Sequence, residues 1–127
     1  MTITGGGTGL SYDSDPNATG ADTFEYRIND GAGGTDVATV SITLTPVNDA
    51  PIADNETITV LEDSAATTVN VLSGDSDVEG DPLTITAKTN GAKGAVAIGT
   101  GGATVTYKPY AGYSGPDTFT YTISDGL

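Results

Sequence analysis

The sequence predicts an all-β fold built as an antiparallel sandwich of short strands, and three observations lead to that prediction. Apolar and polar residues alternate over short stretches, as in TVSITLT at 39–45, and a two-residue period indicates strands with one face on a core. Turn signals separate these stretches, including Asp-Gly at 30–31 and 125–126 and Asn-Gly at 90–91. No segment of useful length shows the 3.6-residue period of an amphipathic helix.

The chain also contains an internal repeat. Residues 3–31, ITGGGTGLSYDSDPNATGADTFEYRINDG, align without a gap with residues 98–126, IGTGGATVTYKPYAGYSGPDTFTYTISDG, at an offset of 95 residues. Self-similarity at a fixed spacing indicates tandem units. We therefore expect 1–47 to be the C-terminal part of a first repeat, 48–52 an interdomain linker, and 53–127 a second repeat.

The strands of the second repeat follow from the alternation in chain order. Six are expected, lettered A to F, over 56–61, 67–72, 83–88, 94–98, 103–108 and 117–124. The first repeat is expected to hold strands E and F and then a seventh strand, G, over 35–46. Seven short strands per repeat with regular turns predict a sandwich of the immunoglobulin type.

The second repeat lacks a G strand of its own, so its strand F is expected to present an open edge. Three fates are open for residues 35–46. They could stay with the first repeat, complete the second repeat within the chain, or complete the second repeat of another chain by strand exchange.

Charge and composition exclude several classes of function. Seventeen acids oppose four bases, and a net charge of −13 argues against nucleic acid or anionic membranes, since basic patches bind both. No run of apolar residues is long enough for membrane insertion. Histidine and cysteine are absent, which removes the usual general base, the common zinc ligands and the thiol nucleophile. An enzyme is not expected, whereas the charge favours divalent cations.

Residues 74–82, GDSDVEGDP, place four acids at alternating positions: Asp75, Asp77, Glu79 and Asp81. Such a cluster is costly unless it is fully solvated or holds a cation. Carboxylate and carbonyl oxygens are the ligands of Ca²⁺, and the spacing fills the first positions of an EF-hand-like pattern without its closing glutamate. Two interpretations stay open, a solvated turn and a calcium site.

Further oxygen ligands are expected beside this loop. In an immunoglobulin-type sandwich, the start of strand A, the B–C loop and the F–G loop lie at one end. That topology brings Asn48, Asp49 and Asp125 to the acidic loop, and residues 13–17 of the first repeat are expected to face the same junction. Asp125 and its counterpart Asp30 have a second interpretation, as residues of an Asp-Gly turn.

Several motifs carry a family resemblance. Asn48-Asp49-Ala50-Pro51 is similar to the calcium-ligating cadherin linker, and Asp75-x-Asp77 resembles the cadherin Asp-x-Asp motif. Together with VNDAP, LED, VLSGDSDVEGDPLTIT, ATVTYKP and DTFTYTISDG, these motifs resemble bacterial cadherin-like tandem repeats of large secreted surface proteins, including RTX-type adhesins. The resemblance implies a cadherin-like β-sandwich, a secreted or cell-surface location, Ca²⁺ that stiffens the junction between neighbouring repeats, and a role in cell adhesion.

A different class of function is also open. Tyr110 and Tyr113 lie in a glycine-rich loop and form an exposed aromatic pair that could stack on sugar rings, as in a carbohydrate-binding module of a secreted polysaccharide-degrading system. Asp22 and Asp117 open strand F in the two repeats and are expected to fix the E–F corner by hydrogen bonds. Glu62-Asp63 is expected at the end opposite the acidic loop.

Overall fold

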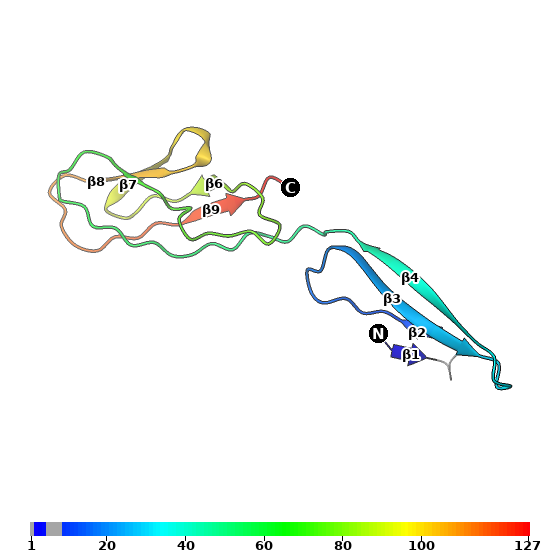
Figure 1. The fold of residues 1–127 in the computed structure, drawn as a ribbon. Helices are drawn as coiled ribbons and strands as arrows, with labels where there is room; N and C mark the ends of the chain where they lie inside the picture. The colour runs from blue at the N-terminus through cyan, green and yellow to red at the C-terminus, as the bar shows by residue number, and fades with distance from the viewer. Residues whose placement is uncertain (1, 5–8) are drawn as a thin grey trace. The chain divides into compact units, whose positions relative to one another are not determined.

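The structure is a computed structural model that describes residues 2–4 and 9–127. The chain divides into two compact units, Met1–Val47 (unit 1) and Asn48–Leu127 (unit 2), drawn in Figure 1. All strand pairs in the described residues are antiparallel, which confirms the all-β class. None of the described helical segments is long and apolar enough to cross a membrane.

Unit 1 consists of two β-ribbons. Strand β1 (Thr2–Thr4) pairs with β2 (Gly9–Ser11), and β3 (Gly20–Asn29) pairs with β4 (Thr35–Leu44) in register over ten residues. The turn between β3 and β4 is held by Asp30, whose Oδ1 accepts the N–H groups of Ala32 and Gly34 at 2.8 and 2.9 Å. Asp30 therefore serves its Asp-Gly turn, one of the two roles considered for this pair of aspartates.

Unit 2 is built from two small sheets. The first has the order β5 (Thr67–Val69), β8 (Val105–Pro109), β7 (Gly94–Ile98), and the second pairs β6 (Thr84–Lys88) with β9 (Tyr121–Ser124). A single turn of 3₁₀ helix, η2 (Thr100–Gly102), joins β7 to β8. The pairing B–E–D against C–F is that of an immunoglobulin-type sandwich without its two outer strands, A and G.

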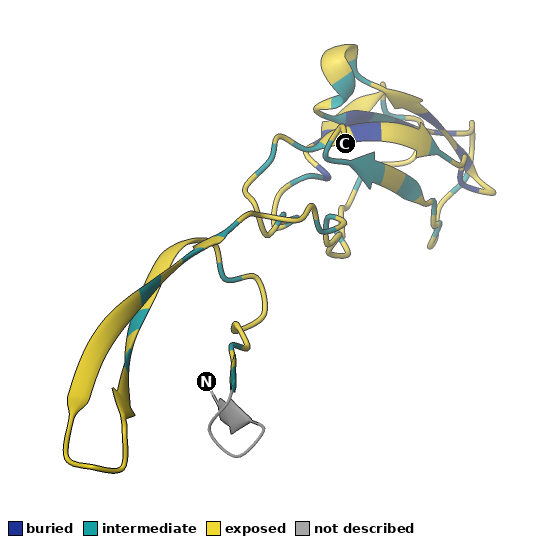
Figure 2. Ribbon diagram, turned by 90° about the vertical axis from the view of Figure 1, so that its right-hand side faces the viewer, coloured by how far each residue is buried: buried dark blue, intermediate teal, exposed yellow. Residues whose placement is uncertain are grey.

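The core of unit 2 lies between these sheets. The buried hydrophobic side chains come from both layers, and they are Val69, Val71, Ile85, Val96, Val105 and Tyr107. In Figure 2 the buried segments, in dark blue, lie in unit 2, whereas none of the described side chains of unit 1 is buried. Valine and isoleucine side chains from the inner faces of the strands therefore form most of the core, as the two-residue period predicts.

Three expected strands are absent or half as long as expected. Strand B, expected over 67–72, is regular only over 67–69, and the other two lie at the edge where a G strand would pair. The structure places no strand over 56–61, which corrects the expected strand A, and strand F is regular over 121–124 but not over 117–120. In unit 1 the counterpart of strand F forms a ten-residue strand because β4 pairs along its whole length. A strand's backbone groups need a partner, so the same sequence loses regular structure where none is present.

Residues 35–44 stay with the first repeat in this structure. They form β4 and pair with β3, from Thr35 opposite Asn29 to Leu44 opposite Gly20. Of the three fates considered for this segment, the structure therefore shows the first.

Candidate functional site

The segment that enters unit 2 is fixed to the acidic loop by a short backbone bridge. The N–H of Ile52 donates to the carbonyl of Ser76 at 2.8 Å, and the N–H of Ser76 donates back at 3.0 Å. A single antiparallel bridge of this kind sets the register between two loops. It attaches Ile52, the last residue of the linker, to the loop at 74–82.

The acidic loop is folded around Asp77. Its Oδ1 accepts the N–H groups of Glu79 at 3.0 Å and Asp81 at 3.1 Å, which closes a compact aspartate-centred turn. Gly80 completes that turn with a φ of 79°, a left-handed conformation that glycine adopts without strain. Asp75 is fixed in a similar way, because its Oδ1 accepts the N–H of Asp54 at 2.8 Å.

The second oxygen of each of these two aspartates is the distinctive feature of the loop. Asp75 Oδ2 and Asp77 Oδ2 are both buried, and neither has a hydrogen-bond partner among the described residues. Leaving a buried acceptor unsatisfied costs about 1–3 kcal/mol, and more when the acceptor is charged. Two such atoms in one loop form an environment that a cation would satisfy.

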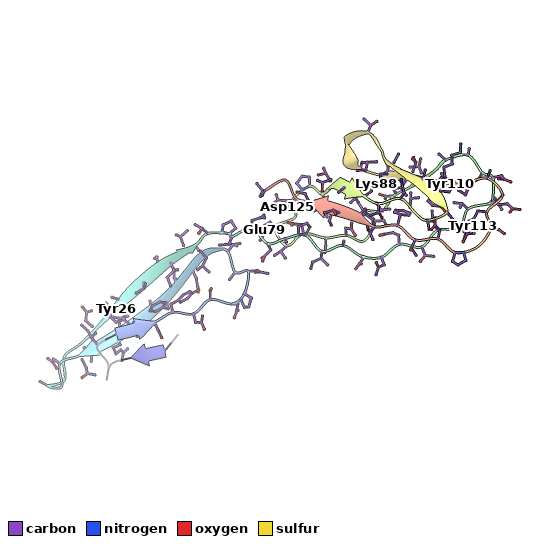
Figure 3. All side chains as sticks on the ribbon, turned by 180° about the vertical axis from the view of Figure 1, so that it is seen from behind. Tyr26, Glu79, Lys88, Tyr110, Tyr113 and Asp125 are labelled. Atoms are coloured by element: carbon purple, nitrogen blue, oxygen red, sulfur yellow. The ribbon has the colours of Figure 1, made fainter. Side chains whose placement is uncertain are left out.

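The other expected ligands gather around the same loop. Asn48 Nδ2 donates to Asp125 Oδ2 at 2.8 Å, and the N–H of Asp49 donates to Glu79 Oε2 at 3.1 Å. The Asn48 amide and the N–H of Leu127 hold the pKa of Asp125 below its ordinary value, because both donate to its carboxylate. In Figure 3, Glu79 and Asp125 are both at the end of unit 2 opposite Tyr110 and Tyr113.

The site residues are thus neighbours, but they are not arranged as a finished coordination shell. Among residues 2–4 and 9–127, no three carboxylates lie close enough together to form a metal-binding group. Lys88, the cation nearest to the loop in sequence, donates to Asn90 Oδ1 at 2.7 Å instead. Side-chain rotation, carbonyl oxygens or water would have to complete the shell of a bound ion.

Sequence reasoning did not single out two acids near this end, Asp54 and Glu56. The hydroxyl of Tyr121 lies 2.9 Å from the Asp54 carbonyl and 2.7 Å from Glu56 Oε2. Burial first, and then the hydrogen bond to Glu56, raise the pKa of Tyr121. Glu56 could not be singled out from the sequence, because it alternates with the apolar residues of the expected strand A, and an acid that faces solvent occupies the same kind of position.

The two E–F corners have the same contacts in both units. Tyr107 donates to Asp117 at 2.8 Å, and its counterpart Tyr12 donates to Asp22 at 2.7 Å. The tyrosine ring stacks on the single phenylalanine of strand F in each case, with ring centres 6.0 and 6.3 Å apart. The expectation that Asp22 and Asp117 fix this corner is confirmed.

Tyr110 and Tyr113 lie at the end of unit 2 opposite Glu79 and Asp125 (Figure 3). Tyr110 is 50% exposed. Tyr113 is half-buried; its hydroxyl donates to the Pro116 carbonyl at 2.6 Å, and Lys93 Nζ lies 5.3 Å from its ring centre. At the same end Asp63 Oδ1 accepts the N–H of Gly112 at 2.7 Å, which places Asp63 away from the acidic loop, as expected.

The sheets and their end loops define unit 2 as a sandwich module of the immunoglobulin type. Comparison with known protein families gives the same class. The chain belongs to the bacterial Ig domain family, whose model matches residues 1–43 and 48–127. Domains of this family are generally non-catalytic structural modules and typically occur as repeats of surface proteins. No curated protein and no solved structure matches the chain.

Proposed function

We propose that this chain is a structural repeat segment of a secreted, cell-surface bacterial adhesin, in which Ca²⁺ binds the acidic end of unit 2 and stiffens the junction between repeats. Membership of the bacterial Ig domain family supports the role as a structural repeat. The buried, unpartnered oxygens Asp75 Oδ2 and Asp77 Oδ2 carry the calcium part of the proposal. The resemblance of the linker and of Asp75-x-Asp77 to cadherin motifs points to the same ion.

The residues present fit a hard cation. Asp75 and Asp77 each direct one oxygen to backbone N–H groups, and the other oxygen of each is buried without a hydrogen-bond partner. Asp81 is half-buried in the same loop, and Glu79 and Asp125 lie at its rim. Because Ca²⁺ accepts six to eight oxygens in irregular geometry, carboxylates from these residues with carbonyls and water would suffice.

The ion would act through the linker. Without a cation, the clustered carboxylates repel one another, and the contacts of Asn48 and Asp49 with the loop end hold the linker by two exposed hydrogen bonds. A bound Ca²⁺ would replace that repulsion with attraction and draw the linker residues onto the loop. The expected consequence is a stiffer connection between successive repeats.

Calorimetric titration of the full chain with Ca²⁺ tests the site. We expect heat of binding, an increase in thermal stability that grows with the ion concentration, and at least a tenfold loss of affinity in Asp75→Asn and Asp77→Asn. Glu62→Gln is the matched control, since it removes one exposed carboxylate in the turn that contains Asp63, away from the loop. If the wild type and both aspartate variants bind Ca²⁺ equally, the proposed calcium site at this loop is refuted and the loop is a solvated turn.

Sedimentation in Ca²⁺ and in chelator tests the stiffening separately. A stiffer linker should change the frictional ratio of the wild-type chain on calcium binding and leave that of Asp77→Asn unchanged. If calcium binds without any such change, the ion belongs to unit 2 alone and has no role at the junction.

A carbohydrate-binding module is the second candidate, and the half-exposed ring of Tyr110 is the observation that favours it. Pull-down on insoluble polysaccharides with wild-type chain and Tyr110→Ala separates the two functions. A structural spacer should bind none of the polysaccharides. A carbohydrate-binding module should bind at least one as the wild-type chain and lose that binding in Tyr110→Ala.

A further inference from the structure

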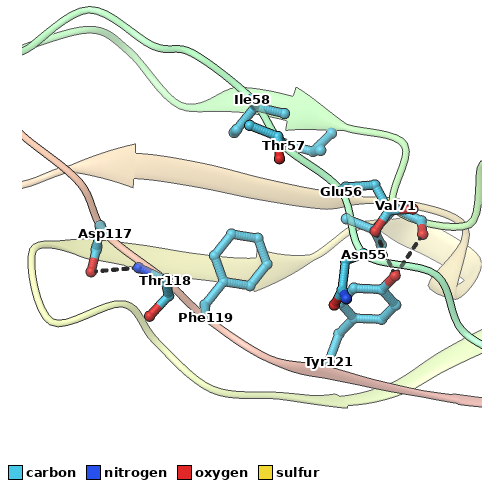
Figure 4. A pocket seen from close by; sticks show the side chains of 10 residues that line it. Asn55, Glu56, Thr57, Ile58, Val71, Asp117, Thr118, Phe119 and Tyr121 are labelled. Atoms are coloured by element: carbon cyan, nitrogen blue, oxygen red, sulfur yellow. Dashed lines mark hydrogen bonds between the residues drawn. The ribbon is translucent and has the colours of Figure 1, made fainter.

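The hydroxyl of Tyr121 lies where the segment that enters unit 2 meets the core. It is 2.7 Å from Glu56 Oε2 and 2.9 Å from the carbonyl oxygens of Asp54 and Val71. Figure 4 shows the hydrogen bonds to Glu56 and Val71. Val71 belongs to the core and is 1% exposed, whereas residues 54–56 follow the linker. The tyrosine therefore joins the entering segment to the core.

These three contacts depend on a single proton. A phenol has one O–H donor, whereas carbonyl and carboxylate oxygens only accept. Tyr121 is thus the shared donor that holds three acceptors around one point. Without its hydroxyl, the lone pairs of Glu56, Asp54 and Val71 would face one another with no hydrogen between them, and a buried acceptor without a donor is costly. We expect residues 54–56 to move away from Val71 when the hydroxyl is removed.

The same entering segment holds Asp75, one of the acids of the proposed calcium site. The N–H of Asp54 donates to Asp75 Oδ1 at 2.8 Å, while the carbonyl of Asp54 faces the Tyr121 hydroxyl. With Oδ1 held in this way, the other oxygen, Asp75 Oδ2, is buried without a partner. After burial and the hydrogen bond to Glu56, the charge of Asp75 also raises the pKa of Tyr121, so the hydroxyl and the carboxylate lie near enough to interact.

Asp77, the other aspartate of the Asp75-x-Asp77 motif, is held in a different way. Its Oδ1 accepts the N–H groups of Glu79 and Asp81 at 3.0 and 3.1 Å, and both donors belong to its own loop. The orientation of Asp77 is therefore set locally, whereas that of Asp75 is set from residues 54–56.

We infer that Tyr121 is a positioning residue of this site: its hydroxyl fixes the backbone of Asp54, whose N–H in turn aims Asp75 Oδ2 at the bound ion. The inference rests on the proposed calcium site and adds to that site a residue that does not touch the ion. A ligand oriented in advance loses less freedom on binding, and residues that orient metal ligands typically contribute about 10–100-fold to affinity. We expect Tyr121→Phe, which removes only the hydroxyl, to weaken Ca²⁺ binding about tenfold.

Calorimetric titration of the full chain with Ca²⁺ tests the inference, with Tyr107→Phe as the matched control. Tyr107 also donates its hydroxyl to a carboxylate, that of Asp117 at the E–F corner, at 2.8 Å. Tyr107→Phe should lose stability in urea denaturation and keep the wild-type affinity for Ca²⁺, whereas Tyr121→Phe should lose affinity. If Tyr121 had a structural role alone, the two variants would bind the ion alike.

Double variants test whether the effect passes through Asp75. Tyr121→Phe should cause no further loss of affinity in Asp75→Asn, because the side chain that it positions is already changed. In Asp77→Asn it should cause its full loss of about tenfold, since Asp77 is held by its own loop. Equal losses in the two backgrounds would overturn the route through Asp75.

A second pair of variants covers the case in which Tyr121→Phe does not fold. Asp54→Pro removes the N–H that Asp75 accepts, whereas Asp54→Ala keeps it, and both variants lose the same exposed carboxylate. Asp54→Pro should bind Ca²⁺ about tenfold more weakly than Asp54→Ala. Equal affinities in this pair would show that the Asp54 N–H does not position Asp75, which refutes the inference.

The titrations also separate this inference from the function on which it rests. If the wild-type chain binds no Ca²⁺, the calcium site and the role of Tyr121 are both refuted. If the wild type binds Ca²⁺ and Tyr121→Phe binds it with equal affinity, the calcium site stands and only the role of Tyr121 is refuted.

Discussion

Tyr107 and Asp117 are expected to stabilise unit 2 through the hydrogen bond between them, so that their contributions to the free energy of unfolding are coupled. The Tyr107 side chain is 6% exposed, and its hydroxyl lies 2.8 Å from Asp117 Oδ2. In Tyr107→Phe the ring keeps its stacking on Phe119, and Asp117 keeps the N–H groups of Lys93 and Thr118, both at 3.0 Å. A hydrogen bond to a charged group contributes about 1.5–3 kcal/mol, and we expect the lower end, about 1.5 kcal/mol.

Asp117→Ala should cost more, about 3 kcal/mol, because it leaves both the Tyr107 hydroxyl and the Lys93 N–H without their acceptor. The double variant should therefore cost less than the sum of the two, with a coupling free energy of about 1.5 kcal/mol. Urea denaturation followed by circular dichroism at pH 7 measures all three, and half-exposed Tyr110→Phe serves as the control. Additive costs within 0.3 kcal/mol, roughly the error of such cycles, would refute the coupling.

The pH dependence of the same pair gives a second check with a definite sign. Burial raises the pKa of Asp117, but the donors Tyr107, Lys93 and Thr118 outweigh it, so the pKa is lowered overall. The stability that ionised Asp117 contributes is therefore present above its unfolded-state pKa and is lost as the pH falls through its folded-state pKa. Burial, and then the bond to Asp117, raise the pKa of Tyr107 to about 12, so its share is complete below about pH 10 and is lost as the pH rises through 12. The difference in the free energy of unfolding between wild type and Tyr107→Phe should be largest between the acidic pH at which Asp117 is protonated and about pH 10.

Three further predictions concern the core, the loop end and Tyr121. Val105→Ala should lower the free energy of unfolding by about 2–3 kcal/mol, because Val105 is 0% exposed, whereas Val47→Ala at an 80% exposed side chain should change it by less than about 0.5 kcal/mol in urea denaturation. Asn48→Ala should raise the pKa of Asp125 toward its ordinary value in a carboxyl NMR titration, since it removes the strongest donor, and an unchanged pKa would show that the contact is absent in solution. Tyr121→Phe should flatten the loss of stability above about pH 10, because burial raises the pKa of Tyr121 and favours its protonated form, and an unaltered alkaline melting curve would contradict that.

Much of the fold could be predicted from local patterns. The alternation at 84–88, 94–98 and 105–109 marks β6, β7 and β8, whose buried side chains Ile85, Val96, Val105 and Tyr107 pack into one core. The repeat predicted the E–F corner, since equivalent residues make equivalent contacts in both units. The neighbours of the acidic loop also followed from sandwich topology, which brings Asn48 to Asp125 across 77 residues of sequence.

The sequence by itself determined the class, the periodicity and the acidic loop, because these depend on side-chain pattern and charge within short windows. Only the tertiary structure decided which oxygens of Asp75 and Asp77 are left without a donor, since backbone N–H groups of Asp54, Glu79 and Asp81 take the others. It also decided that Asp-Thr-Phe is a strand in unit 1 and irregular in unit 2. The physical reason is that a strand depends on its partner: β4 satisfies the backbone of β3, whereas no strand of the described residues pairs with the equivalent edge of unit 2.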